Sequence, residues 1–221
     1  MAGISKAGRA ALPVALAGVF VAALASPATA APVQPAPAAA QAAVVQAAAP
    51  ATAARAAATV TESQWLADVK TSLAGARGYV EQRTSGANAA VRPAIVFDID
   101  NTTLQTHFHP FSQPAVGPSL DLATYAHSRG VAVIFVTARP DFIDSLTRCA
   151  LQRAGYPVDG LHGRDFGDLF QPVQEFKTAQ RAEVELEGYT VIANVGNNTT
   201  DLTGGHAERT FKLPDYDGLL S

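Results

Sequence analysis

The chain has 221 residues, with 19 Asp and Glu against 16 Lys and Arg, and a formal net charge of −3. It has no block of clustered basic residues, which argues against a nucleic-acid polymer as its partner. Cys149 is its only cysteine, which excludes a disulfide within the chain.

Residues 1–30 have the pattern of a secretory signal peptide. Lys6 and Arg9 precede an uncharged apolar run at residues 11–25, and Ala28-Thr29-Ala30 is a small-residue cleavage site. The apolar run is shorter than the roughly 20 residues that span a bilayer, so export is favoured over an uncleaved membrane anchor. We therefore expect a secreted or cell-envelope-associated protein with no stable membrane span after cleavage.

Residues 31–60 predict a disordered linker. Sixteen of these thirty residues are Ala, four are Pro, and Arg55 is the only charged one. Such small side chains bury too little surface to offset the entropy lost on ordering. A stalk through a cell envelope is the alternative interpretation. Residues 61–221, about 160 in number, suit a single domain with a sizeable core.

The domain is expected to begin with one amphipathic helix. Thr61 and Gln64 have the spacing of a capping box. Apolar residues then recur at steps of three or four, which predicts a helix packed outside a sheet. These residues are Trp65, Val69, Leu73, Ala76 and Val80.

Two carboxylates follow the first expected strand. The apolar run at residues 94–97 is typical of a central parallel strand that is buried on both faces. Asp98 and Asp100 come directly after it, two residues apart, so both can point to the same side. Open α/β sheets bind ligands at the carboxyl ends of their strands. The alternative is that the run Asp100-Asn101-Thr102 only makes a turn and a helix cap.

Strands and helices alternate in the rest of the chain. Residues 105–118 form an irregular flap, and Pro118 can start a helix that Gly130 ends. Strands are expected at 131–137, 160–163, 189–195 and 208–212, and helices at 141–153 and 174–187. This order predicts an α/β fold with a doubly wound, mostly parallel sheet and helices on both faces. The segments between these elements are too short for a large cap domain.

The helix at 141–153 carries the single cysteine. Phe142, Leu146, Cys149 and Ala150 share one face at helical spacing, so we interpret Cys149 as a small core residue.

The polar residues at the strand ends resemble the four signatures of the haloacid dehalogenase superfamily. Asp98-Ile99-Asp100-Asn101-Thr102 resembles the first, and a strand that ends in Thr137 resembles the second. Lys177, near the start of a helix, resembles the third. The strand that runs into Gly196-Asn197, with Asp201 beyond, resembles the fourth, except that the family usually has Asp where this chain has Asn197. The resemblance covers about residues 62–221, and residues 201–214 look like the secreted acid phosphatases of class B, or subfamily IIIB.

The resemblance implies roles for four of these residues, on a Rossmann-like core. Asp98 would attack phosphorus and form an aspartyl phosphate. Asp100 would protonate the leaving oxygen and later take a proton from water. Thr137 and Lys177 would bind the phosphoryl group.

The resemblance also implies Mg²⁺, which prefers hard oxygen ligands. Asp98, the backbone carbonyl of Asp100, Asn197 and Asp201 would hold it. An Asn at position 197 offers an amide oxygen but removes one negative charge, so we expect weaker Mg²⁺ binding or Asp201 as a direct ligand.

Three further residues have two interpretations each. Arg139 can bind phosphate with its planar fork, or pair with a surface acid. His107 and His109 can form a ligand pair, or lie on a loop surface.

These patterns together predict a secreted, Mg²⁺-dependent acid phosphatase that acts on small phosphate monoesters. The alternative is a catalytically weak or inactive binding or storage protein that keeps the fold. A third possibility is an envelope-associated protein in which residues 31–60 are the functional part.

Overall fold

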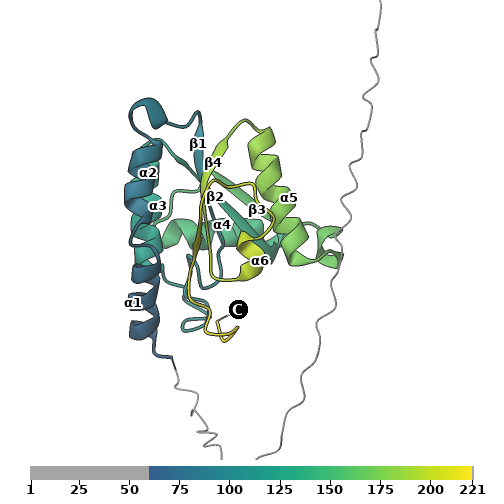
Figure 1. The fold of residues 1–221 in the computed structure, drawn as a ribbon. Coiled ribbons are helices and arrows are strands. Elements are labelled where there is room, and N and C mark those ends of the chain that lie inside the picture. The colour runs from purple at the N-terminus through teal and green to yellow at the C-terminus, as the bar shows by residue number, and fades with distance from the viewer. Residues whose placement is uncertain (1–59, 221) are drawn as a thin grey trace, which may run out of the picture. The chain divides into compact units, whose positions relative to one another are not determined.

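Five parallel strands form the centre of residues 60–220, the part of the chain that the computed structural model describes (Figure 1). The strand order is β3-β2-β1-β4-β5, so β1 is the central strand. The predicted signal peptide and linker lie outside the described residues. The strands are β1 (Pro93–Phe97), β2 (Ala132–Pro140), β3 (Gly160–Arg164), β4 (Thr190–Gly196) and β5 (Thr210–Lys212).

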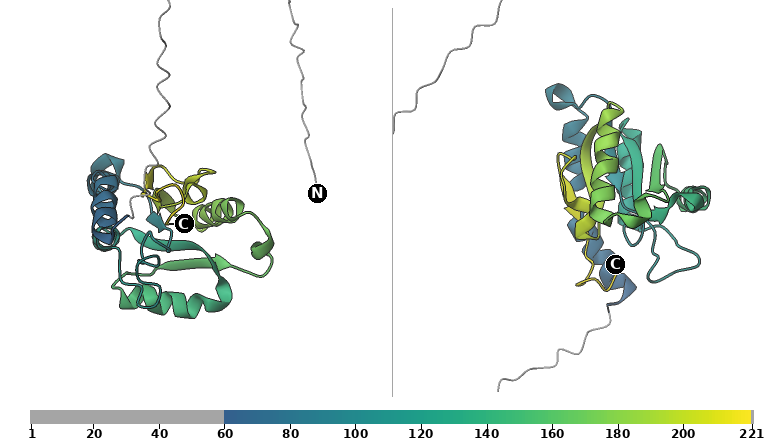
Figure 2. Two further views of the ribbon diagram at one scale, coloured as in Figure 1. Left: turned by 90° about the horizontal axis from the view of Figure 1, so that it is seen from below. Right: turned by 90° about the vertical axis from the view of Figure 1, so that its right-hand side faces the viewer.

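Helices cover both faces of this sheet (Figures 1 and 2). Successive side chains of a strand point to opposite faces, so Ile95 and Phe97 pack with α1, α2 and α3. Ala94 and Val96 pack on the other face with Phe176 of α5. The helices are α1 (Glu62–Ser72), α2 (Ala76–Arg83), α3 (Gly117–Ser128), α4 (Asp144–Arg153), α5 (Val173–Leu186) and α6 (Thr199–Leu202). The predicted α/β fold with a parallel sheet is confirmed.

The expected single helix after Thr61 is wrong, because the segment forms two helices. α1 ends at Ser72 and α2 begins at Ala76, and Gly75, a weak helix former, lies in the break. The five predicted apolar residues are nevertheless all buried in one core. Thr61 accepts a hydrogen bond from the Gln64 backbone, but the Gln64 side chain donates to Asp68, so only half of the capping box forms.

The predicted buried face of the helix at 141–153 is also wrong, except at Ala150, which packs partly buried against the core. Cys149 is exposed, and Phe142 and Leu146 are 79% and 71% exposed. Thr147 and Leu151, four residues apart, face the sheet instead. Both rows have helical spacing, so periodicity alone did not distinguish them, and contact with the sheet decided the orientation.

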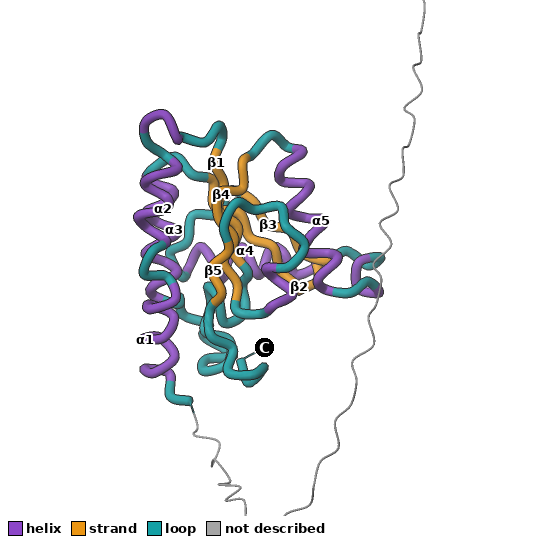
Figure 3. Tube along the Cα trace, in the orientation of Figure 1, coloured by secondary structure: helices purple, strands orange, loops and turns teal. Residues whose placement is uncertain are grey.

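The flap at residues 105–116 contains no helix or strand, and it belongs to the loops coloured teal in Figure 3. Gln105 donates its backbone N–H to Pro114, and Val116 donates to Thr103. The flap is therefore attached at both ends, and residues 60–220 contain no large cap domain. Within this range no helix has the length and apolar character needed to cross a membrane.

Candidate functional site

A cavity of about 290 Å³ lies at the carboxyl ends of β1 and β4. It contains five of the seven predicted site residues. The two others, Thr137 and Arg139, flank Ala138 at the end of β2, and Ala138 lines the cavity. The lining residues are Asp98, Asp100, Ala138, Val173, Lys177, Asn197, Asn198, Thr200 and Asp201.

Lys177 is a buried cation between two carboxylates. α5 places its Nζ 2.5 Å from Oδ1 of Asp98 and 2.6 Å from Oδ1 of Asp201. At most 8% of any of these three side chains is exposed. The second oxygen of Asp98, Oδ2, accepts no hydrogen bond from residues 60–220. One oxygen of Asp98 is therefore held and the other is available for chemistry.

The electrostatics of this cluster raise the proton affinity of Asp98. Burial raises the pKa of Asp98, Lys177 opposes the rise and Asp201 adds to it, with a result of about 6. Burial lowers the pKa of Lys177, but Asp98 and Asp201 more than compensate, so its pKa lies above the ordinary value. Lys177 thus stays charged, and Asp98 is ionised above about pH 6.

Asp100 is paired with Arg139. The guanidinium donates from Nε and Nη2 to the two carboxylate oxygens, at 2.9 and 2.7 Å. Arg139 also donates to the Gln113 side chain of the flap, and its backbone N–H donates to the buried Thr137 hydroxyl. Of the two interpretations of Arg139, this structure contains the pair with an acid, and that acid is a predicted catalytic residue.

The loop after β4 is held by a helix cap that we did not predict. Asn198 caps α6, and Oδ2 of Asp201 accepts the Asn198 backbone N–H at 2.8 Å, which completes a capping box. The spacing Asn198-x-x-Asp201 is the sequence signal that would have indicated it. A Cβ at Gly196 would overlap with Asp201, so this close approach requires glycine.

Arg181 forms no salt bridge with Glu185, although the two residues lie one helical turn apart on α5. It is buried and donates to three backbone carbonyls, of Asp201 in α6 and of Thr203 and Gly205 directly after α6. One of these carbonyls belongs to Asp201, so Arg181 fixes the backbone of a cavity residue. Glu185 pairs with His206 instead.

The two histidines of the flap point to different partners. His109 lies 3.1 Å from Glu62 at the start of α1, and the His107 ring packs edge-on against Phe108. Between residues 60 and 220 no three His, Cys, Asp or Glu side chains are arranged to hold a metal ion.

The oxygens of the cavity nevertheless fit Mg²⁺. This ion keeps several waters and needs only one or two carboxylates. Asp98 offers a carboxylate whose Oδ1 accepts one hydrogen bond, from Lys177, and Asn197 offers Oδ1, which accepts one, from Thr102 at 3.1 Å. Both oxygens of Asp201 already accept hydrogen bonds, from Lys177 and Asn198. The donor set therefore fits Mg²⁺ with Asp98 and Asn197 as side-chain ligands.

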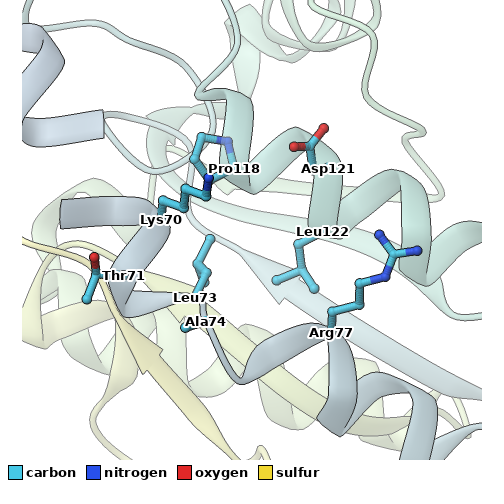
Figure 4. A pocket seen from close by; sticks show the side chains of 8 residues that line it. All are labelled: Lys70, Thr71, Leu73, Ala74, Arg77, Pro118, Asp121 and Leu122. Carbon is cyan, nitrogen blue, oxygen red and sulfur yellow. The ribbon is translucent and has the colours of Figure 1, made fainter. Parts of the chain in front are cut away.

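A larger cavity of about 480 Å³ lies elsewhere, where α1 and α2 meet α3 (Figure 4). Its floor includes Leu73 and Leu122, and the charged Lys70, Arg77 and Asp121 lie around it. It contains none of the predicted site residues, so size alone does not mark the candidate site.

A model of the haloacid dehalogenase superfamily, subfamily IIIB (acid phosphatase), matches residues 109–219, half of the chain. This range includes Thr137, Lys177, Asn197 and Asp201 and begins after Asp98.

Part of the chain is also similar to two curated plant proteins. The Stem 28 kDa and Stem 31 kDa glycoproteins of Glycine max are each 33% identical to the chain over 106 residues, 46% of its length. The matched part is 42% and 36% of those proteins, so the chain spans less than half the length of either relative.

Two structures of the class C acid phosphatase from Bacillus anthracis have a TM-score of 0.56, at 17% identity and, with tungstate bound, 18%. Both cover 71% of this chain and 80% of the phosphatase chain, and at this identity the likeness shows a shared fold.

Proposed function

Because the chain belongs to subfamily IIIB of the haloacid dehalogenase superfamily, the acid phosphatase family, we propose that it is an exported, Mg²⁺-dependent phosphomonoesterase. The observation that supports this most is the arrangement of Asp98. One oxygen is fixed by Lys177, the other is unbonded, and the side chain lines an open cavity.

In the first step Oδ2 of Asp98 attacks phosphorus and the bond from phosphorus to the ester oxygen breaks. The products are an aspartyl phosphate and the leaving alcohol, which takes its proton from Asp100. Lys177 and Thr137 stabilise the charge on the phosphoryl oxygens. Lys177 also keeps Asp98 ionised at neutral pH, because its charge opposes the effect of burial on the Asp98 pKa.

In the second step water attacks the aspartyl phosphate, Asp100 takes the proton, and phosphate leaves with Asp98 restored. Asp100 accepts two hydrogen bonds from Arg139 in the structure, so before the first step Arg139 must release it and it must take up a proton from solvent. Arg139 is then free to donate the same planar pair of N–H groups to phosphate. The Asp100–Arg139 pair is therefore the arrangement without substrate. When substrate binds, Arg139 leaves Asp100 and pairs with the phosphoryl group.

Mg²⁺ would be held by Asp98, the Asp100 carbonyl and Asn197, and when bound it supplies positive charge to the phosphoryl oxygens. Asp201 takes part through Lys177, whose ammonium it binds at 2.6 Å. In this arrangement Asp201 is a positioning residue.

The substrate is a small molecule. A cavity of about 290 Å³ is large enough for a phosphoryl group and part of its leaving group, and residues 60–220 contain no cap that closes over it. Export agrees with the predicted signal at residues 1–30 and with two relatives that are named glycoproteins. A chain net charge of −3 disfavours polyanionic partners such as nucleic acids.

The proposal is tested by hydrolysis of a chromogenic phosphate monoester, first with Mg²⁺ and then with a chelator. We expect turnover that stops on chelation and is absent in Asp98→Asn. A panel of nucleotides, sugar phosphates and phosphotyrosine, read by phosphate release, then identifies the substrate. A folded protein with no turnover at any pH would contradict the proposal.

A binding or storage protein that keeps the fold is the second candidate. The observation in its favour is at the fourth signature, where Asn197 replaces the usual carboxylate and both oxygens of Asp201 are engaged. Tight phosphate binding without hydrolysis would support it.

A further inference from the structure

The end of the described chain packs beneath the candidate site. Residues 213–220, here called the C-terminal segment, follow β5 and lie at the carboxyl edge of the sheet (Figure 1). Leu213 and Leu220 are buried in the same core as β1. The Tyr216 hydroxyl donates to Asp68 of α1 at 2.6 Å, and the Leu220 N–H donates to the Asp215 carbonyl. The segment is therefore fixed in place along its length.

Two buried amides donate to one carbonyl of this segment. Nδ2 of Asn101 and Nδ2 of Asn197 each lie 2.8 Å from the Leu220 carbonyl oxygen. Asn101 follows Asp100 directly, and Asn197 lines the cavity. The Leu220 carbonyl thus joins the first and the fourth signature, which come from different strands.

Asn101 also holds the flap. Its Oδ1 accepts the His107 backbone N–H at 2.8 Å and the Thr106 hydroxyl at 3.2 Å. Its φ of 54° lies in the left-handed region, which Asn tolerates better than most residues. One side chain therefore connects the loop of Asp98 and Asp100, the flap and the C-terminal segment.

We propose that the Leu220 carbonyl positions the loop of Asp98 and Asp100 and the loop of Asn197, and that Asn101 is the positioning residue that joins this carbonyl to the first loop. This inference rests on the proposed phosphatase function. It also gives a reason why this chain has Asn197 where the family usually has Asp. An ionised carboxylate cannot donate a hydrogen bond, so an Asp side chain at this position would turn an oxygen toward the buried Leu220 carbonyl. Asn197 instead donates to that carbonyl and keeps Oδ1 for the cavity.

The first test compares the same substitution at two adjacent positions. Leu220→Asp places a charge at a site that is 1% exposed and should displace the segment, whereas Leu219→Asp, at 51% exposed, is the matched control. We expect kcat to fall about tenfold or more in Leu220→Asp, with a smaller change in KM, and to stay unchanged in Leu219→Asp. Hydrogen exchange should become faster in residues 98–107 of Leu220→Asp only.

The second test leaves the segment intact and removes single hydrogen bonds. Asn101→Asp keeps the oxygens that accept from the flap but loses the donor to Leu220, and Asn101→Gly loses both connections while it still permits the positive φ. We expect Asn101→Asp to lower kcat, and to add little to the loss in Leu220→Asp because both changes break the same link. Asn101→Gly should also increase exchange in residues 105–107.

Equal kcat and equal exchange in Leu220→Asp and wild type would overturn the inference. If Leu220→Asp does not fold, the test depends on Asn101→Asp. A wild-type kcat in Asn101→Asp would then overturn the inference. A wild-type protein without hydrolysis would end the proposed function. The exchange measurements would then still show whether the segment holds residues 98–107, so the two failures are distinguishable.

Discussion

Replacement of Lys177 by Met leaves two buried carboxylates without their shared cation. The lost contacts are 2.5 Å to Asp98 and 2.6 Å to Asp201, in a cluster whose side chains are at most 8% exposed. Removal of one partner from a buried ion pair costs about 3–5 kcal/mol, a large part of the 5–15 kcal/mol that stabilises a typical domain. We therefore expect Lys177→Met to lower the free energy of unfolding by about 3–5 kcal/mol at about pH 8.

The free energy of unfolding that Lys177→Met loses should be greater at high pH than at low pH. The pKa of Asp98 is about 6 in the folded wild type against 3.8 in the unfolded chain, so the folded state binds this proton more tightly. The contribution of this group to stability therefore falls as pH rises from about 4 through 6. Without Lys177 the Asp98 pKa rises further, so the variant keeps its proton to higher pH. The difference in free energy of unfolding between wild type and Lys177→Met should thus be largest near pH 8 and smaller near pH 5.

The assay is urea denaturation of wild type, Lys177→Met and a control at both pH values. Lys70→Met is a matched control, because Lys70 is exposed on α1 and forms no ion pair within residues 60–220. It should change stability by less than about 0.5 kcal/mol. A Lys177→Met deficit that is below about 1 kcal/mol, or equal at the two pH values, would refute the electrostatic reasoning.

Three further outcomes are expected of the proposed enzyme. Thr137→Val should raise KM and the phosphate inhibition constant about tenfold, because it removes one hydrogen bond to a charged group. Unchanged constants in steady-state assays would contradict the role of Thr137. Asp100→Asn should lower kcat about 10²–10⁴-fold for alkyl esters and less for esters whose leaving group needs no proton, and an equal loss for both would exclude proton transfer. Asn197→Asp should lower the Mg²⁺ concentration for half-maximal activity, and an unmoved titration curve would show that charge at this position does not set Mg²⁺ affinity.

The sequence was sufficient for the sheet and for the residues that meet at its edge. Apolar runs that end in polar residues indicated β1, β2 and β4, and parallel strands bring their carboxyl ends to one edge, so Asp98 and Asn197 could be placed in one site. Lys177 lies on α5, and only the family resemblance placed it there. The family match confirms the superfamily, and the structural likeness confirms the fold. The catalytic roles and the Mg²⁺ ligands remain predictions.

The errors have a common physical origin in tertiary contacts. Cys149 was placed in the core because two rows of α4 have helical spacing, and only the sheet selects between them. Arg181 and Glu185 have the spacing of a helical ion pair, but Arg181 donates instead to the carbonyls of Asp201 and Gly205. The contact of Asn101 with Leu220 joins residues 119 positions apart, and no local pattern in the sequence signals it.

The central claim is that the Asp98 carboxylate is transiently phosphorylated. The most direct measurement is acid quench of the protein during turnover of a phosphate monoester, followed by peptide mass mapping. The account predicts a phosphate on the peptide that contains Asp98, and none in Asp98→Asn. Phosphate release without a phosphorylated Asp98, or with the group on another residue, would contradict it.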